Sequence, residues 1–130
     1  MLLLAYAYII HLLSGLVLLG VFFWIYTKKI TPFDEITLIS QGNISAALSL
    51  GGALLGFCLT IASSILHSDS FLMFLAWGAG AMLVQALCYA AITRVLPQMN
   101  DAITQNNAAM GALMGAASLT VGIINAASLS

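Results

Sequence analysis

Four long apolar runs, separated by short polar segments, dominate the pattern of the chain. The runs cover about residues 2–26, 43–66, 71–95 and 107–129. Each is close to the roughly 20 residues that an α-helix needs to cross a hydrocarbon core of about 30 Å. The pattern therefore predicts an all-α protein with four transmembrane helices.

Two of the polar segments contain a proline that favours the start of a short helix. Thr31 as a cap and Pro32 at the first helical position predict a helix over residues 32–40. Pro97 repeats this role before a second short helix, which we expect over residues 98–106. Each half of the chain thus carries one short helix between its long ones.

The first short helix combines an apolar face with two acids. Phe33, Ile36 and Ile39 recur at helical spacing, which predicts an amphipathic helix resting on the bilayer surface. Asp34 and Glu35 are candidates for an acid/base pair, but adjacent residues point to different sides of a helix. We therefore favour a solvated first turn over catalysis.

Composition supports a membrane protein and excludes several functions. Hydrophobic residues make up 62% of the chain and charged residues 5%, against roughly a quarter charged in soluble domains. A net charge of −1 excludes a basic surface for nucleic acid. Cys58 and Cys88 lie inside apolar runs, where we expect free thiols rather than a disulfide. No spacing typical of metal ligands occurs, so we expect no metal and no cofactor.

The few basic residues predict the topology. Lys28 and Lys29 follow the first run, and Arg94 ends the third. By the positive-inside rule all three are cytoplasmic, which places both termini in the periplasm. The first run lacks the basic start and the cleavage site of a secretory signal, so we expect it to be retained as a span.

The second half of the chain repeats the first. Residues 41–56 and 105–120 each join a Gln-x-Asn triplet to a run rich in Ala, Gly and Ser, about 64 residues apart. We therefore expect two two-span repeats, residues 1–66 and 67–130, within one membrane domain. Because each repeat holds an even number of spans, the repeats should be parallel, and we expect a pseudo-twofold axis along the membrane normal to relate them.

The second and fourth runs are rich in small residues, which let membrane helices approach closely. They contain two GxxxG patterns, and they hold more small residues than four helices need internally. We therefore predict a homo-oligomer in which these helices line the subunit contacts or a central axis. The residues predicted for helix packing or oligomer contact are Ala47, Gly51, Gly52, Gly56, Gly111 and Gly115.

The Gln-x-Asn triplets stand at the start of the two small-residue runs. Asn43 and Asn107 are suited to cap these helices, and Gln41 and Gln105 precede them. Two ordinary N-caps are the favoured interpretation. The alternative is a polar mouth or partner contact, because the free N–H groups and the dipole of a helix N-terminus attract polar or anionic groups.

Three polar side chains interrupt the spans and form a possible intramembrane polar site. His11 and Gln85 lie inside the first and third runs, and Asn125 lies near the outer end of the fourth. We favour hydrogen bonds to neighbouring helices, with a proton relay at His11 or a solute contact at Gln85 as the alternative. The scatter of histidines and acids along the chain leaves no catalytic constellation, so we expect no enzyme.

Several segments together carry a family resemblance, namely Ile30-Thr31-Pro32, Asn43-Ile-Ser-Ala-Ala47, Ala76-Trp77-Gly78, Asn107-Ala-Ala109 and Asn125-Ala-Ala127. Over its whole length the chain resembles the YjfL-like family of small bacterial inner-membrane proteins, a domain of unknown function numbered 350. The resemblance implies four spans, two copies of one domain and a place in the bacterial inner membrane. It implies no activity, catalytic residue or cofactor, and it suggests membrane-stress or membrane-remodelling proteins as partners.

Two hypotheses for function follow. The first is a non-enzymatic, homo-oligomeric protein of the inner membrane that organises or supports a membrane assembly through its short cytoplasmic helices. The second is a channel or transporter for a small solute or ion, with the polar residues along its path. The lack of charged residues inside the spans counts against the second hypothesis. In both, the partners are the lipid bilayer and further copies of the chain.

Overall fold

The computed structural model describes residues 1–129, and all of their regular structure is helical. The long helices are α1 (Leu2–Ile25), α3 (Ile44–His67), α4 (Phe71–Val95) and α6 (Ala108–Ser128). A π-helical turn, η1 (Tyr26–Ile30), extends α1, and two short helices are α2 (Glu35–Ser40) and α5 (Met99–Thr104). With η1 included, four helices are long and apolar enough to cross a membrane. The predicted all-α class and the number of spans are therefore confirmed.

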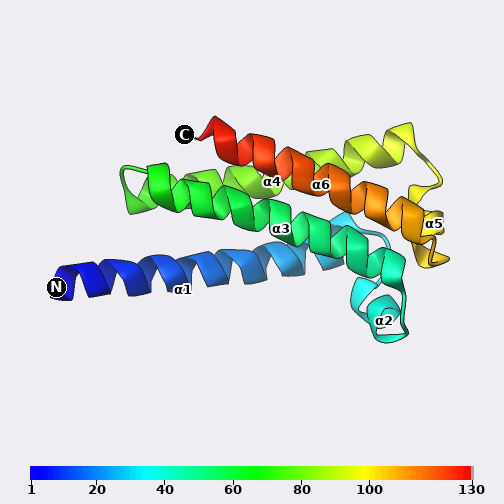
Figure 1. The fold of residues 1–130 in the computed structure, drawn as a ribbon, viewed down its shortest axis with the longest axis horizontal. Helices are drawn as coiled ribbons and strands as arrows, with labels where there is room; N and C mark the ends of the chain where they lie inside the picture. The colour runs from blue at the N-terminus through cyan, green and yellow to red at the C-terminus, as the bar shows by residue number, and fades with distance from the viewer. Residues whose placement is uncertain (130) are drawn as a thin grey trace.

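Both short helices lie at one end of the bundle, which we call the short-helix end, and both chain termini lie at the other (Figure 1). In the same view α3 and α6 run side by side in the same direction. Helix α4 packs against both of them, whereas α1 packs mainly against α3. The N-terminal half of α1 lies apart from the other helices, so its side chains are exposed.

Stacked aromatic rings fasten α1 to the bundle near the short-helix end. Phe22 lies flat on Phe57 of α3, with ring centroids 4.3 Å apart. Tyr26 meets Tyr89 of α4 edge to face at 5.9 Å. Such pairs contribute about 0.5–1.5 kcal/mol beyond the area that they bury. The last turns of α1 are therefore fixed in the core even though its first turns are not.

The first short helix begins later than the sequence predicted. Asp34, not Thr31, is its N-cap, and the Asp34 carboxylate accepts the backbone N–H of Thr37 at 3.2 Å. Thr31 has extended backbone angles, as expected for a residue before proline. Its hydroxyl bonds to Glu35 and to carbonyls of η1, and caps no N–H group of α2. The predicted cap and the helical position of Pro32 were therefore wrong.

Candidate functional site

Helices α3 and α6 touch backbone to backbone along a line that we call the α3–α6 seam. A Cβ atom built on Gly52 would overlap the backbone of Gly115, and one on Gly115 would overlap the carbonyl of Leu48. A Cβ atom on Gly122 would likewise overlap Gly56. Small residues permit this approach, which supplies van der Waals contact where lipid provides no hydrophobic drive.

Hydroxyl groups of α3 cross the seam to backbone carbonyls at or within α6. The pairs are Ser45 with Asn107 at 2.7 Å, Thr60 with Gly122 at 3.2 Å and Ser63 with Ala126 at 2.6 Å. Hydrogen bonds between membrane helices contribute about 0.6 kcal/mol each on average. Close packing therefore contributes most to the stability of the seam, and these hydrogen bonds contribute less.

The six residues predicted for packing or oligomer contact divide between the seam and an outward face. Those in the seam are Gly52, Gly56, Gly111 and Gly115. Ala47 is exposed, and nothing lies within 4 Å of a Cβ atom built on Gly51. Within one chain, therefore, Ala47 and Gly51 are available to lipid or to another copy.

The glycine contacts of the seam depart from exact twofold symmetry. A twofold axis would bring equivalent positions of the two repeats together, so contact of Gly52 with Gly115 would require contact of Gly51 with Ala116. Gly51 instead faces open space and Ala116 is exposed. The pair is therefore not exactly symmetric, but Gly51, Gly115 and Ala116 line one groove of about 290 Å³ between α3 and α6, so the pseudo-twofold axis stays a prediction.

The two Gln-x-Asn triplets form the same turn at the short-helix end. Gln41 and Gln105 are the C-caps of α2 and α5. The middle residue adopts a positive φ, 90° at Gly42 and 62° at Asn106, which closes many helices and suits Gly or Asn. The final Asn then caps the next long helix. The repeated motif thus marks the end of one helix and the start of the next.

The two capping asparagines differ in their surroundings. Asn43 is 7% exposed, and its amide nitrogen donates to the carbonyl of Ile103 at 2.9 Å. Asn107 is exposed, and within residues 1–129 its side chain makes only the capping hydrogen bond. Gln41 and Gln105 are also exposed. Asn43 therefore joins the two halves of the chain, while the other three amides face outward.

The three intramembrane polar residues do not come together. His11 bonds to a carbonyl of its own helix at 2.8 Å, and its ring lies 5.7 Å from that of Phe74. Gln85 is buried on α4 and donates to the carbonyl of Ser118 at 3.1 Å, leaving its own amide oxygen without a partner. Asn125 is half-buried on α6. These side chains form no common site.

A carboxyl group is buried at the short-helix end. Glu35 is 1% exposed; the Thr31 hydroxyl bonds to its Oε1, and its Oε2 has no partner. The phenols of Tyr26 and Tyr89 lie close enough to interact electrostatically with the carboxylate. The Tyr26 hydroxyl is buried beside the Ser49 hydroxyl, and that of Tyr89 bonds to Asn100. We call Glu35, Thr31, Tyr26, Tyr89 and Asn100 the Glu35 cluster.

Burial changes the acidity of this carboxyl group. The pKa of Glu35 is raised from 4.5 to about 7, mainly by loss of hydration and in smaller part by the neighbouring Asp34, against the lowering effect of the Thr31 hydrogen bond. The exposed Asp34 behaves oppositely, because hydrogen bonds from Thr37 hold the pKa of that carboxyl below its usual value. Adjacent acids therefore differ in charge near neutral pH.

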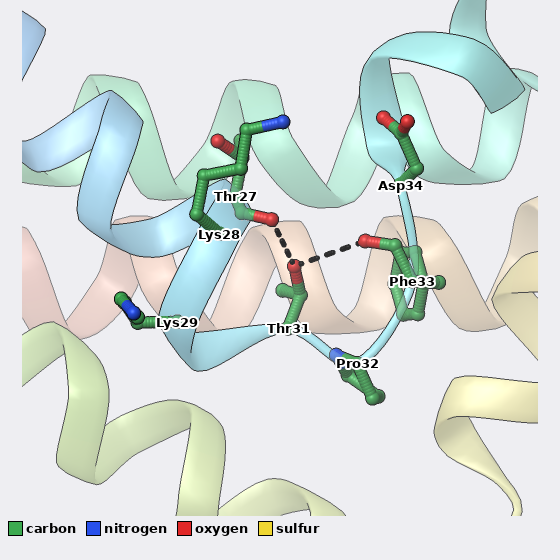
Figure 2. A pocket seen from close by; sticks show the side chains of 7 residues that line it. All are labelled: Thr27, Lys28, Lys29, Thr31, Pro32, Phe33 and Asp34. Atoms are coloured by element: carbon green, nitrogen blue, oxygen red, sulfur yellow. Dashed lines mark hydrogen bonds between the residues drawn. The ribbon is translucent and has the colours of Figure 1, made fainter.

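An open pocket of about 450 Å³ adjoins the cluster (Figure 2). Its lining includes Lys28, Lys29, Thr31 and Asp34. Figure 2 shows the Thr31 hydroxyl between two backbone carbonyls, each 3.4 Å away. Because Thr31 also bonds to Glu35, it connects the pocket with the buried carboxyl group.

The prediction that Glu35 lies in a solvated turn is wrong. A signal for its burial was present, since Leu38 and Ile39 follow it by three and four residues on the same helix face. The predicted apolar face contains Phe33, Ile36 and Ile39, but Ile36 is 49% exposed and so lies outside the buried face of α2. Among residues 1–129, no three His, Cys, Asp or Glu side chains are placed to hold a metal ion.

Comparison with known proteins identifies relatives. The family model for a Domain of Unknown Function (DUF350) matches residues 1–129. The chain is 34% identical to UPF0719 inner membrane protein YjfL of Escherichia coli strain K12 over 124 residues, which cover 95% of this chain and 93% of that protein. The protein of the same name from Escherichia coli O157:H7 matches equally. No solved structure matches.

Proposed function

Since the chain belongs to the DUF350 family and is an integral, multi-pass inner-membrane protein, we propose that it forms a homo-oligomer that organises or supports a membrane assembly. It catalyses no reaction in this proposal. The observation that carries the proposal is the outward face of α3 around Ala47 and Gly51. Contact with lipid does not require small residues, whereas close contact with another helix does.

The predicted repeat indicates what covers this face. A shift of about 64 residues makes Gly51 the counterpart of Gly115 and Ala116 the counterpart of Gly52. Gly52 and Gly115 meet inside the chain, whereas their counterparts face outward. A second copy can therefore repeat the seam, with α6 of one copy against α3 of the next.

A groove on α6 suits this arrangement. It has a volume of about 470 Å³ and lies between α4 and α6, with Cys88, Ala91, Ala116 and Thr120 in its lining. Ala116 and Thr120 are the counterparts of Gly52 and Gly56, the positions at which α3 receives α6. We propose that the contact is head-to-tail, with α6 of one copy on α3 of the next, and that the rotation between successive copies closes a ring.

Cross-linking between copies tests the proposed contact. Gly51→Cys and Ala116→Cys are placed in separate copies that lack Cys58 and Cys88, and the two variants are mixed in lipid. We expect a cross-linked dimer that needs both variants. Gly20→Cys replaces Gly51→Cys in the control, since Gly20 on α1 also faces open space. Equal cross-linking with Gly20→Cys, or none with Gly51→Cys, contradicts the head-to-tail contact.

The proposed orientation exposes the short helices to cytoplasmic partners. Lys28 and Lys29 in η1 and Arg94 in the last turn of α4 lie toward the short-helix end. Under the positive-inside rule this end would face the cytoplasm. The outward amides of Gln41 and Gln105 would then be available to membrane-stress or membrane-remodelling proteins. Reporter tags on both termini test this, because a periplasmic location is expected for each.

A second candidate function is conduction of a small solute or ion. It is favoured by the Gln85 amide oxygen, a polar atom of α4 that is buried without a hydrogen-bond partner within residues 1–129. Such groups occur along the paths of channels and transporters. Conduction would be supported by a solute flux into proteoliposomes that is lost in the Gln85→Leu variant while the helical content of the variant stays unchanged. Flux unaffected by Gln85→Leu would exclude Gln85 from a path.

A further inference from the structure

The Glu35 carboxyl group has no positive partner in the part of the chain that the structure describes. The groups that act on it are the Thr31 hydroxyl, the Asp34 carboxylate and the phenols of Tyr26 and Tyr89. None of these carries a positive charge. A buried carboxylate without a cation is strongly disfavoured, and such a group usually becomes neutral instead.

The geometry of the cluster suits a proton rather than a metal ion. Within residues 1–129, Glu35 Oε2 is buried without a hydrogen-bond partner, whereas the Tyr26 hydroxyl is buried beside the Ser49 hydroxyl. Calcium takes about six to eight oxygen ligands, and magnesium requires an octahedral set. A proton needs a single oxygen, and it removes the charge that burial disfavours.

A route for the proton exists at Thr31. Its hydroxyl bonds to Glu35 on one side and lines the open pocket on the other. A hydroxyl both donates and accepts, so it can pass a proton between pocket water and the carboxyl group. Lys28 and Asp34 are the charged groups that line the pocket beside this route, together with Lys29.

We propose that Glu35 is a proton-binding site whose occupancy holds α2 against the membrane-spanning helices. Glu35 is the first residue of α2, while Tyr26 and Tyr89 belong to η1 and α4. Protonated Glu35 is compatible with this buried position. When the proton leaves, the carboxylate gains hydration only by moving out of the cluster, and α2 moves with it.

The acidity of the group places this change in the physiological range. The pKa of Glu35 is raised to about 7 by burial, so a docked α2 loses its proton near neutral pH. Docking is therefore complete at acidic pH and weakens as pH rises through about 7. The site would act as a pH-dependent contact between a short helix and the spans, whatever the oligomeric state.

Spin-label distances in lipid nanodiscs test the proposal. Labels on Ile36→Cys in α2 and Gln105→Cys after α5, two exposed positions, report docking in chains without Cys58 and Cys88. We expect a single distance at pH 5 and a second, different population that grows with a midpoint near pH 7. Glu35→Gln, which mimics the protonated form, should keep the single distance at every pH.

Two controls make the outcome decisive. Asp34→Asn removes the exposed neighbouring acid and should leave most of the pH response. Infrared difference spectra between the two pH values should show loss of a protonated carboxyl band that is absent in Glu35→Gln. A wild-type distance independent of pH, or a pH response that persists in Glu35→Gln, overturns the proposal. A midpoint that moves with potassium or sodium concentration at constant ionic strength would indicate a cation site instead.

Discussion

Gly52 and Gly115 meet at the α3–α6 seam, where a Cβ atom on Gly52 would overlap the backbone of Gly115 and one on Gly115 would overlap that of Leu48. Their neighbour Gly51, one residue along α3, has nothing within 4 Å of the same position. Two adjacent glycines therefore have different roles. One fixes the packing inside the chain, and the other lies on the outward face proposed to receive a second copy.

Alanine substitutions should separate these roles. Gly52→Ala forces α3 away from Gly115, and overpacking of this kind costs about 1–3 kcal/mol. Gly51→Ala adds a methyl group in open space and should leave the free energy of unfolding within about 1 kcal/mol of wild type, since Ala also favours helix. Unfolding in mixed detergent micelles followed by circular dichroism compares the two. Equal losses would place Gly51 in an internal contact.

The two capping asparagines should respond unequally to the same change. Asn107→Ala removes a helix cap, which typically costs about 1 kcal/mol. Asn43→Ala removes a cap and also the bond to Ile103, so its cost should be larger, about 2 kcal/mol. The same unfolding assay measures both. A larger loss for Asn107→Ala would show that the link between Asn43 and Ile103 contributes little.

Gln85→Leu should leave stability almost unchanged. The substitution removes one hydrogen bond to Ser118, but it also removes a buried amide oxygen that has no partner. These effects oppose one another, so the change in unfolding free energy should stay within about 1 kcal/mol. A loss several times larger would mean that Gln85 has further partners, for example in a neighbouring copy.

Stability should fall as pH rises because of Glu35. The pKa of this group is 4.5 in water and about 7 in the folded chain, so the folded state binds the proton more tightly. The stabilisation is complete below pH 4.5 and is lost as pH rises through about 7, by up to about 3 kcal/mol. Glu35→Gln should flatten this part of the pH profile of the melting temperature. An unchanged profile would contradict the assigned pKa.

Much of the fold was readable from the sequence, because long apolar runs and helix caps act locally. The spans and the capping roles of Asn43 and Asn107 follow from such local signals. The start of α2 was missed because Thr31 and Asp34 are both good caps, and only the fold shows that Thr31 is engaged by Glu35.

The candidate sites depended on contacts between distant segments and were therefore harder to predict. The Glu35 cluster joins η1, α2 and α4 with the segment around Asn100, which no spacing along the chain reveals. The GxxxG patterns showed that helices touch, but not which face of α3 meets α6. That face decides whether Gly51 is internal or outward.

Electron-microscope class averages of the purified protein in lipid nanodiscs test the central claim, assembly of like copies, most directly. A head-to-tail contact between α6 of one copy and α3 of the next predicts closed rings of several copies with rotational symmetry. Such rings should be lost in Gly51→Leu and kept in Gly20→Leu. Particles that contain a single four-helix chain, or dimers with a twofold axis, would contradict it.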